Sequence, residues 1–138
     1  MKINIKLIDN KLEFFDELSK LNNVTIEEMV LNFIDDKLNS IILLEHGFYY
    51  DKIAKRLFTS NNQIVKLSNY EELLFDLLIN NLNEFVTIEN IFNHIWGKEV
   101  SIFTLRNIIK KIRDKTYYEI IFNKNSYGYK IKEGKKEC

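Results

Sequence analysis

The chain opens with strict alternation of polar and apolar residues. Ile3, Ile5 and Leu7 occupy every second position, which is the period of a strand with one buried face, so we predict a strand over residues 2–8. The polar side chains on the opposite face of this strand are Lys2, Asn4 and Lys6.

Two helices are predicted after this strand. Apolar residues recur at helical spacing over residues 11–21, and Asn22-Asn23 then favours a helix end. Thr25 and Glu28 have the spacing of a capping box, which begins a second helix with its own apolar stripe. The first 45 residues therefore predict a strand followed by two helices.

The pattern changes at Gly47. Three β-rich pieces follow, at residues 48–50, 56–58 and 64–67, and turn-prone residues separate the last two. These pieces predict a small antiparallel sheet.

Helical spacing returns from residue 68 onward. Ser68 and Glu71 form a second capping box, Thr87 begins the next helix, and a third helix is predicted over residues 101–115. Trp96-Gly97 ends the middle helix. The predicted inward faces are Leu73, Leu74, Leu77 and Leu78; Ile88, Ile91, Phe92 and Ile95; and Ile102, Leu105, Ile108, Ile109 and Ile112.

A β-hairpin is predicted to close the chain, with strands at residues 119–122 and 128–132. Three helices followed by a hairpin, with a short turn between the last two helices, is the order of a winged helix-turn-helix. The predicted fold class is therefore α+β.

The third helix carries polar and basic residues opposite its apolar stripe. Arginine or lysine can pair with guanine in the major groove and asparagine with adenine, while other cations bind phosphates. The candidate DNA-binding residues are Thr104, Arg106, Asn107, Lys110, Lys111 and Arg113. An ordinary amphipathic helix with a hydrated basic face would show the same pattern.

Composition indicates a globular protein. The 138 residues contain 46% hydrophobic and 29% charged residues and no proline, which is enough for a real core. The longest apolar run, residues 41–44, is far shorter than a membrane span of about 20 residues. The N-terminus does not resemble a signal peptide, so we expect a cytoplasmic protein that does not enter membranes. The single cysteine, Cys138, excludes an internal disulfide.

The net charge of zero conceals a gradient. Residues 1–45 hold five lysines against nine acidic residues, whereas residues 98–138 hold eleven basic residues against five acidic ones. The basic C-terminal third favours a polyanionic partner, although a hydrated surface balanced by the acidic half is the alternative.

No catalytic or cofactor motif stands out. His46 and His94 are the two histidines, and neither has cysteines or acids at metal-binding spacing. The sequence contains no phosphate-binding loop and no nucleophile beside a base. We therefore expect a non-enzymatic protein without a cofactor or a metal.

Residues from about 48 to 132 contain an ordered set of short motifs: Leu67-Ser68 with Glu71 and Leu73-Leu74; residues 86–91 leading to Ile95-Trp96-Gly97; Leu105-Arg106 with residues 109–115; and Ile121 with Gly128-Tyr129-Lys130. In this order the motifs resemble those of the OmpR/PhoB-type winged-helix DNA-binding domain.

This resemblance implies a recognition helix over residues 101–115 and a wing over residues 119–132 that touches the minor groove or the DNA backbone. The wing candidates are Lys124, Asn125 and Tyr127. Two features depart from the family: Ser126 stands where glycine is usual, and the loop between the last two helices, which in some members touches RNA polymerase, is very short.

The first 45 residues resemble, more weakly, the ribbon-helix-helix proteins. In that family two chains pair their strands, and a lone strand with two helices cannot satisfy its own backbone. We therefore expect a homodimer through residues 1–45. Lys2, Asn4 and Lys6 are possible second DNA contacts, but this acidic segment could serve dimerisation alone.

Together these patterns predict a strand-helix-helix dimerisation segment over residues 1–45 and a winged-helix domain over residues 46–138. We expect no phospho-receiver domain, because such a domain needs about 120 residues and 45 residues precede the winged helix in this sequence. We expect a transcription regulator that binds double-stranded DNA, with RNA polymerase or another regulator as a further candidate partner. The alternative is a protein-interaction adaptor that keeps the winged-helix fold.

Overall fold

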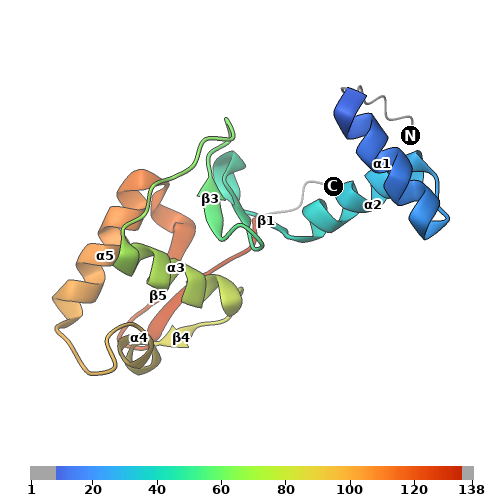
Figure 1. Cartoon of the computed structure of the whole chain (residues 1–138). Coiled ribbons are helices and arrows are strands. Elements are labelled where there is room, and N and C mark those ends of the chain that lie inside the picture. Colours follow the sequence, from blue (N-terminus) through green and yellow to red (C-terminus); the bar gives the residue numbers. More distant parts are fainter. Residues whose placement is uncertain (1–8, 135–138) are drawn as a thin grey trace. The chain divides into compact units, whose positions relative to one another are not determined.

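The computed structural model describes residues 9–134, which form two compact units (Figure 1). The first unit ends at Ser40 and the second begins at Ile41. The predicted strand over residues 2–8, with Lys2, Asn4 and Lys6, lies outside the described residues. Cys138 also lies outside them.

The described part of the first unit consists of two helices in contact, α1 (Asp9–Asn22) and α2 (Ile26–Asn39). Asn23 adopts a left-handed conformation (φ 57°) just after α1, which confirms the predicted helix end. The predicted capping box of α2 is also confirmed. The Glu28 backbone N–H donates to Thr25 Oγ1 over 3.1 Å, and the Thr25 N–H donates to Glu28 Oε2 over 3.4 Å.

Much of the apolar stripe of these two helices is exposed. Of the side chains described in this unit, Ser19, Met29 and Ser40 are buried, whereas Leu21 is 81% exposed. Leu12, Leu31 and Leu38 are also exposed. Two helices of 14 residues each have little room for a core of their own.

The second unit begins with an antiparallel sheet of β1 (Ile41–Leu43), β2 (Tyr49–Asp51) and β3 (Arg56–Phe58), in that order. The sequence interpretation missed β1 and put the domain boundary after residue 45. Ile42 pairs with Tyr50, and both side chains are buried in the second unit's core. The boundary therefore lies earlier than predicted, because strand pairing across the turn at Glu45–Gly47 assigns β1 to the winged-helix unit.

The predicted β-rich piece at residues 64–67 forms less sheet than expected. Ile64 makes an isolated bridge to Phe58, and the Val65 N–H donates to the Leu57 carbonyl over 2.9 Å. The chain then passes directly to the next helix cap at Ser68.

Three helices follow: α3 (Asn69–Asn80), α4 (Ile88–Ile95) and α5 (Ile102–Lys115). All three predicted helices are confirmed, with N-caps at Ser68, Thr87 and Ser101. Gly97 takes φ 70° after α4 and ends that helix as predicted.

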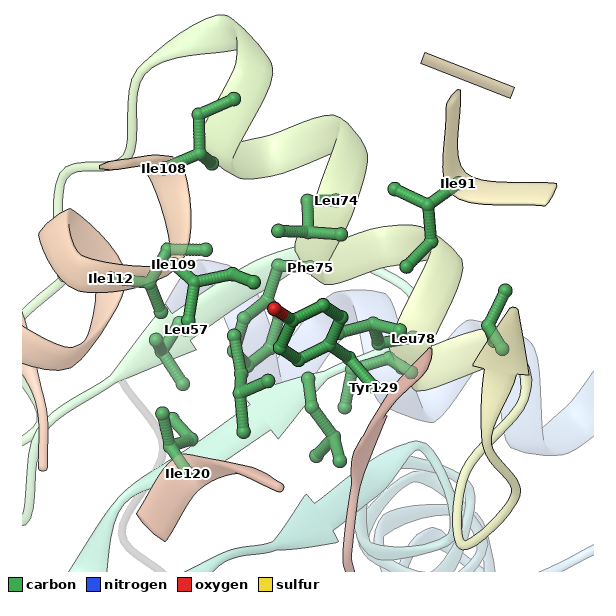
Figure 2. Close-up of a cluster of buried hydrophobic side chains, with 14 of the residues drawn as sticks. Leu57, Leu74, Phe75, Leu78, Ile91, Ile108, Ile109, Ile112, Ile120 and Tyr129 are labelled. Carbon is green, nitrogen blue, oxygen red and sulfur yellow. The ribbon is translucent and has the colours of Figure 1, made fainter. Parts of the chain in front are cut away.

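The core surrounds α3, which contacts α4, α5 and strand β6 (Gly128–Ile131). Figure 2 shows Leu74, Phe75 and Leu78 of α3 among side chains from the other elements. The inward face of α3 differs from the prediction, since Leu73 is 42% exposed and Phe75 is buried. The four leucines have the spacing of a helical stripe. The buried face of α3 is set instead by its contacts with α4, α5 and β6, and these contacts cannot be deduced from the spacing of apolar residues within α3.

The last sheet forms the wing. It contains β4 (Val86–Thr87), β5 (Ile121–Lys124) and β6 in the order β4-β6-β5, all antiparallel. The first wing strand starts later than predicted because residues Tyr118–Ile120 form a 3-10 turn. A Cβ on Gly128 would lie 2.0 Å from the Val86 carbonyl oxygen, so only glycine allows β4 and β6 to approach this closely.

Candidate nucleic-acid interface

The buried face of α5 fixes which side chains point away from the core. Leu105, Ile108, Ile109 and Ile112 are buried, as predicted. The opposite side is exposed to solvent and carries Thr104, Arg106, Asn107, Lys110 and Lys111. The structure therefore brings five of the six predicted α5 residues together on an open helix surface.

Phe103 lies in the same exposed stripe, and the sequence interpretation missed it. Its side chain is 68% exposed, and residues 103, 106, 107 and 110 follow the i, i+3, i+4, i+7 spacing of one helix face. The guanidinium carbon of Arg106 lies 5.8 Å from the centre of the Phe103 ring. The helical spacing was the signal that could have placed Phe103 among the candidate residues.

The first turn of α5 is held by Ser101. The Phe103 N–H donates to Ser101 Oγ over 3.2 Å, and the Thr104 N–H donates to the Ser101 carbonyl over 3.0 Å. This cap fixes the backbone at the end of α5 where Phe103 and Arg106 are exposed.

Arg113 differs from the other predicted α5 residues because it is half-buried and has protein partners. Its NH2 group donates to the Ile121 carbonyl over 2.6 Å, and its guanidinium carbon lies 4.3 Å from the centre of the Tyr118 ring. Its buried Nε has no hydrogen-bond partner among the described residues. Arg113 therefore links the end of α5 to the start of β5.

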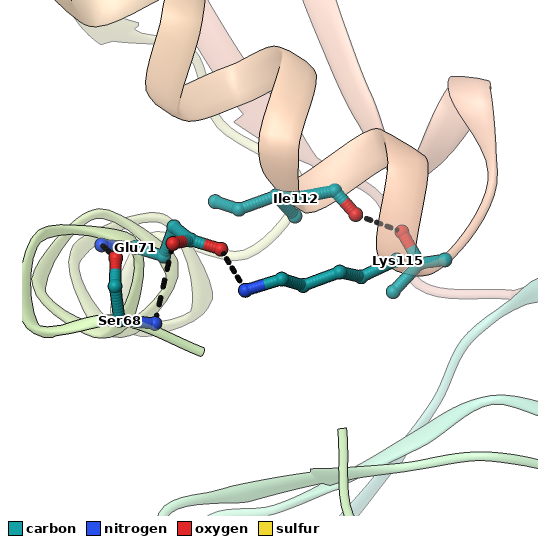
Figure 3. A network of polar contacts seen from close by, with 5 residues as sticks. Ser68, Glu71, Ile112 and Lys115 are labelled. Carbon is teal, nitrogen blue, oxygen red and sulfur yellow. Dashed lines mark hydrogen bonds and ion pairs between the residues drawn. The ribbon is translucent and has the colours of Figure 1, made fainter. Parts of the chain in front are cut away.

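A second link holds the last turn of α5 against α3 (Figure 3). Lys115 Nζ donates to Glu71 Oε1 over 2.6 Å, and Glu71 Oε2 accepts from the Ser68 N–H over 3.2 Å. Burial of Glu71 opposes its ionisation, but the hydrogen bonds from Lys115 and Ser68 and the charge of Lys115 outweigh that effect and lower the pKa of its carboxyl. The carboxylate therefore stays ionised and anchors α5.

The predicted wing residues lie together at the hairpin tip. Lys124, Asn125 and Tyr127 are all exposed, and the Tyr127 N–H donates to the Lys124 carbonyl over 2.9 Å to close the turn. Ser126, which stands where the family usually has glycine, adopts φ 58°. The Tyr127 carbonyl accepts from the Ile88 N–H over 3.0 Å, so the tip is fixed to the start of α4.

Lysines and aromatic rings alternate on the wing. The Nζ of Lys124 lies 4.9 Å from the Tyr127 ring centre, and that of Lys130 lies 4.4 Å from the Phe85 ring centre. Lys132 lies 5.8 Å from the Phe122 ring centre. Lys130 and Lys132 were not among the predicted site residues, although both fall in the predicted strand over residues 128–132, where a spacing of two places them on one face.

Residues 9–134 contain no group of three or more histidine, cysteine or acidic side chains that could hold a metal ion. Within the same residues, no helix is long and apolar enough to cross a membrane.

Comparisons with known proteins come from structure alone, because no protein-family model and no curated protein matches the sequence. The DNA-binding domain of CpxR from E. coli is 17% identical, and the match covers 69% of this chain and 98% of that one with a TM-score of 0.55. The Klebsiella pneumoniae RstA DNA-binding domain, solved in complex with the RstA box, is 14% identical, with 67% and 96% of the two chains covered and a TM-score of 0.55.

A third similar structure is DrrB, an OmpR/PhoB homologue from Thermotoga maritima. It is 19% identical with a TM-score of 0.57, and the match covers 78% of this chain and 53% of DrrB. These likenesses confirm the predicted α+β fold of the OmpR/PhoB-type winged-helix domain.

Proposed function

We propose that this chain is a sequence-specific transcription regulator that binds double-stranded DNA. In this proposal α5 reads the major groove, and the wing over residues 119–132 contacts the minor groove or the backbone. The observation that carries the proposal is the exposed stripe on α5, where Arg106, Asn107 and Lys110 share one face of the helix. The opposite face of α5 is apolar and packs into the core. The RstA domain of the same fold was solved in complex with its DNA box, which supports this reading.

The chemistry of the stripe suits base recognition. Arginine can make two hydrogen bonds to guanine O6 and N7, and asparagine can make two to adenine N6 and N7. The flanking Thr104, Lys110 and Lys111 have the donors that phosphate oxygens accept. We assign the bases to Arg106 and Asn107 and the phosphates to the flanking residues.

The first unit, residues 1–40 of the predicted segment 1–45, is proposed to make the protein a homodimer. The exposed leucines of α1 and α2 support this assignment, because burying them against a second copy would supply the core that two short helices lack. Deleting residues 1–8 should then give monomers by light scattering. A deletion variant that stays dimeric at micromolar concentration would disprove this mode of dimerisation.

Selection of bound fragments from random DNA tests the main proposal. We expect enrichment of a defined sequence, and we expect its affinity to fall steeply as salt rises, because each phosphate contact releases counterions. Arg106→Ala is the test variant, and Arg56→Ala, an exposed arginine on β3, is the matched control. If no sequence is enriched, the winged helix serves instead as a protein-interaction adaptor, whose apolar interface would be much less sensitive to salt.

A further inference from the structure

We infer that Phe103 is a specificity-determining residue whose ring contacts the C5 methyl group of a thymine in the major groove. This inference rests on the proposed function, because it assigns a base to a residue of the same α5 stripe.

Phe103 lies on the exposed surface near the start of α5. A phenylalanine that is 68% exposed at the second residue of α5 leaves a large apolar surface in water. It lies one helical turn before Arg106 and Asn107, on the face that points away from the core. The N-terminal residues of a recognition helix are the ones that contact base edges, so α5 would place this ring among the bases.

The four bases present different groups in the major groove. Guanine, adenine and cytosine present hydrogen-bond donors or acceptors there, and thymine presents a methyl group beside its O4. A phenyl ring has no hydrogen-bonding group, so it would desolvate polar base edges without compensation. A phenyl ring cannot donate a hydrogen bond to phosphate oxygens either. The thymine methyl is therefore the partner that this side chain fits.

Other exposed rings of the second unit lie outside the α5 stripe. Tyr118 packs under the Arg113 guanidinium, and Phe122 lies near Lys130 and Lys132. Phe103 also has a cation nearby, but its partner is Arg106 of the same stripe, whose guanidinium carbon lies 5.8 Å from the ring centre. The two side chains are close enough to address neighbouring bases, so we expect the thymine to stand next to the guanine that Arg106 reads.

The test uses the DNA selected by the unmodified full chain. Each thymine is replaced in turn by uracil, which lacks only the C5 methyl, and the dissociation constant is measured by fluorescence anisotropy at fixed salt. One uracil should weaken binding about fourfold, which corresponds to the burial of a single methyl group. Phe103→Ala should bind the thymine site more weakly and should show no further loss with that uracil. Tyr70→Ala removes an exposed ring on α3, outside both the α5 stripe and the wing; it is the control and should keep the full thymine preference.

The possible results separate this inference from the proposed function. If DNA is selected but uracil is tolerated at every position, or if Phe103→Ala keeps the same thymine preference, the assignment of Phe103 is wrong while DNA binding stands. If no DNA is selected, both fail. If Phe103→Ala changes the oligomeric state by light scattering and uracil has no effect, the ring belongs to a protein interface and the inference is overturned.

Discussion

Lys115 in the last turn of α5 donates a 2.6 Å hydrogen bond to Glu71 in the first turn of α3, across 44 positions of sequence. The same Glu71 carboxylate accepts the backbone N–H of Ser68, the N-cap of α3. One buried carboxylate, only 2% exposed, therefore both caps a core helix and anchors the proposed recognition helix.

This arrangement predicts a pH dependence of stability. Because the folded protein holds the pKa of Glu71 below its ordinary value of 4.5, ionised Glu71 stabilises the fold above that pH. The contribution should be lost as the pH falls through the lower, folded-state pKa. Glu71→Gln should remove this part of the acid destabilisation in urea unfolding at a series of pH values. A Glu71→Gln variant with the same pH profile as the parent would contradict the assignment.

Replacing Arg113 should lower the stability of the fold, whereas replacing Arg106, a proposed DNA contact, should leave the stability nearly unchanged. Arg113→Ala removes the hydrogen bond to Ile121 and the contact with Tyr118, so its free energy of unfolding should fall by about 1–3 kcal/mol. Arg106→Ala changes an exposed side chain and should stay within about 0.5 kcal/mol of the parent. Chemical denaturation measures both values. Equal stability of the two variants would show that the Arg113 contacts do not support the fold.

Arg106 and Arg113 show which features could be predicted from the sequence and which could not. Local signals were sufficient for the helix starts, because capping boxes such as Ser68 with Glu71 involve residues three positions apart. They were also sufficient to place the basic face of α5. They could not separate Arg113 from Arg106, because the partner of Arg113 is a carbonyl on β5 that only the folded chain brings near.

Non-local pairing explains the other differences. Residues 41–43 form too short a run to signal a strand, and they became β1 because β2 supplies the hydrogen bonds. Leu73 fits the leucine stripe, but α4, α5 and β6 surround a slightly different face of α3. The overlooked Phe103 is different, since its place on the α5 surface followed from helical spacing alone.

The wing tip should become more stable when Ser126 is replaced by glycine. Ser126 has φ 58°, a left-handed conformation that costs a non-glycine residue about 1–2 kcal/mol. Part of the gain is offset by glycine's greater freedom in the unfolded chain, so Ser126→Gly should raise the free energy of unfolding by about 0.5–1 kcal/mol. Asn125→Gly, at a neighbouring position without a positive φ, should lower it. Urea unfolding tests both, and a destabilised Ser126→Gly variant would contradict this account of the turn.

The α5 stripe should divide into base contacts and phosphate contacts. Arg106→Ala or Asn107→Ala should cost about 1–3 kcal/mol at the selected site and relax its sequence preference. Lys110→Ala or Lys111→Ala should weaken binding to all sequences and make the salt dependence shallower. Anisotropy titrations at several salt concentrations distinguish the two classes. If all four variants bind as the parent does, α5 is not the recognition helix.

The wing and the N-terminal segment compete as the second DNA contact. Lys124 is exposed at a tip that the Ile88–Tyr127 hydrogen bond holds in place, and it belongs to residues 98–138, which have eleven basic residues against five acidic ones. Lys2 and Lys6 would be doubled in a dimer, but residues 1–45 carry nine acidic residues against five lysines. Repulsion between those acids and phosphate acts within about 10 Å at 0.1 M salt, so the wing should contribute more.

We therefore predict that Lys124→Ala reduces DNA affinity more than Lys2→Ala and Lys6→Ala combined. Anisotropy at one fixed salt concentration compares the two variants, and Lys52→Ala, an exposed lysine outside both segments, is the control. The opposite order would mean that the N-terminal segment reads DNA as a ribbon-helix-helix protein does, with the winged helix as the accessory contact.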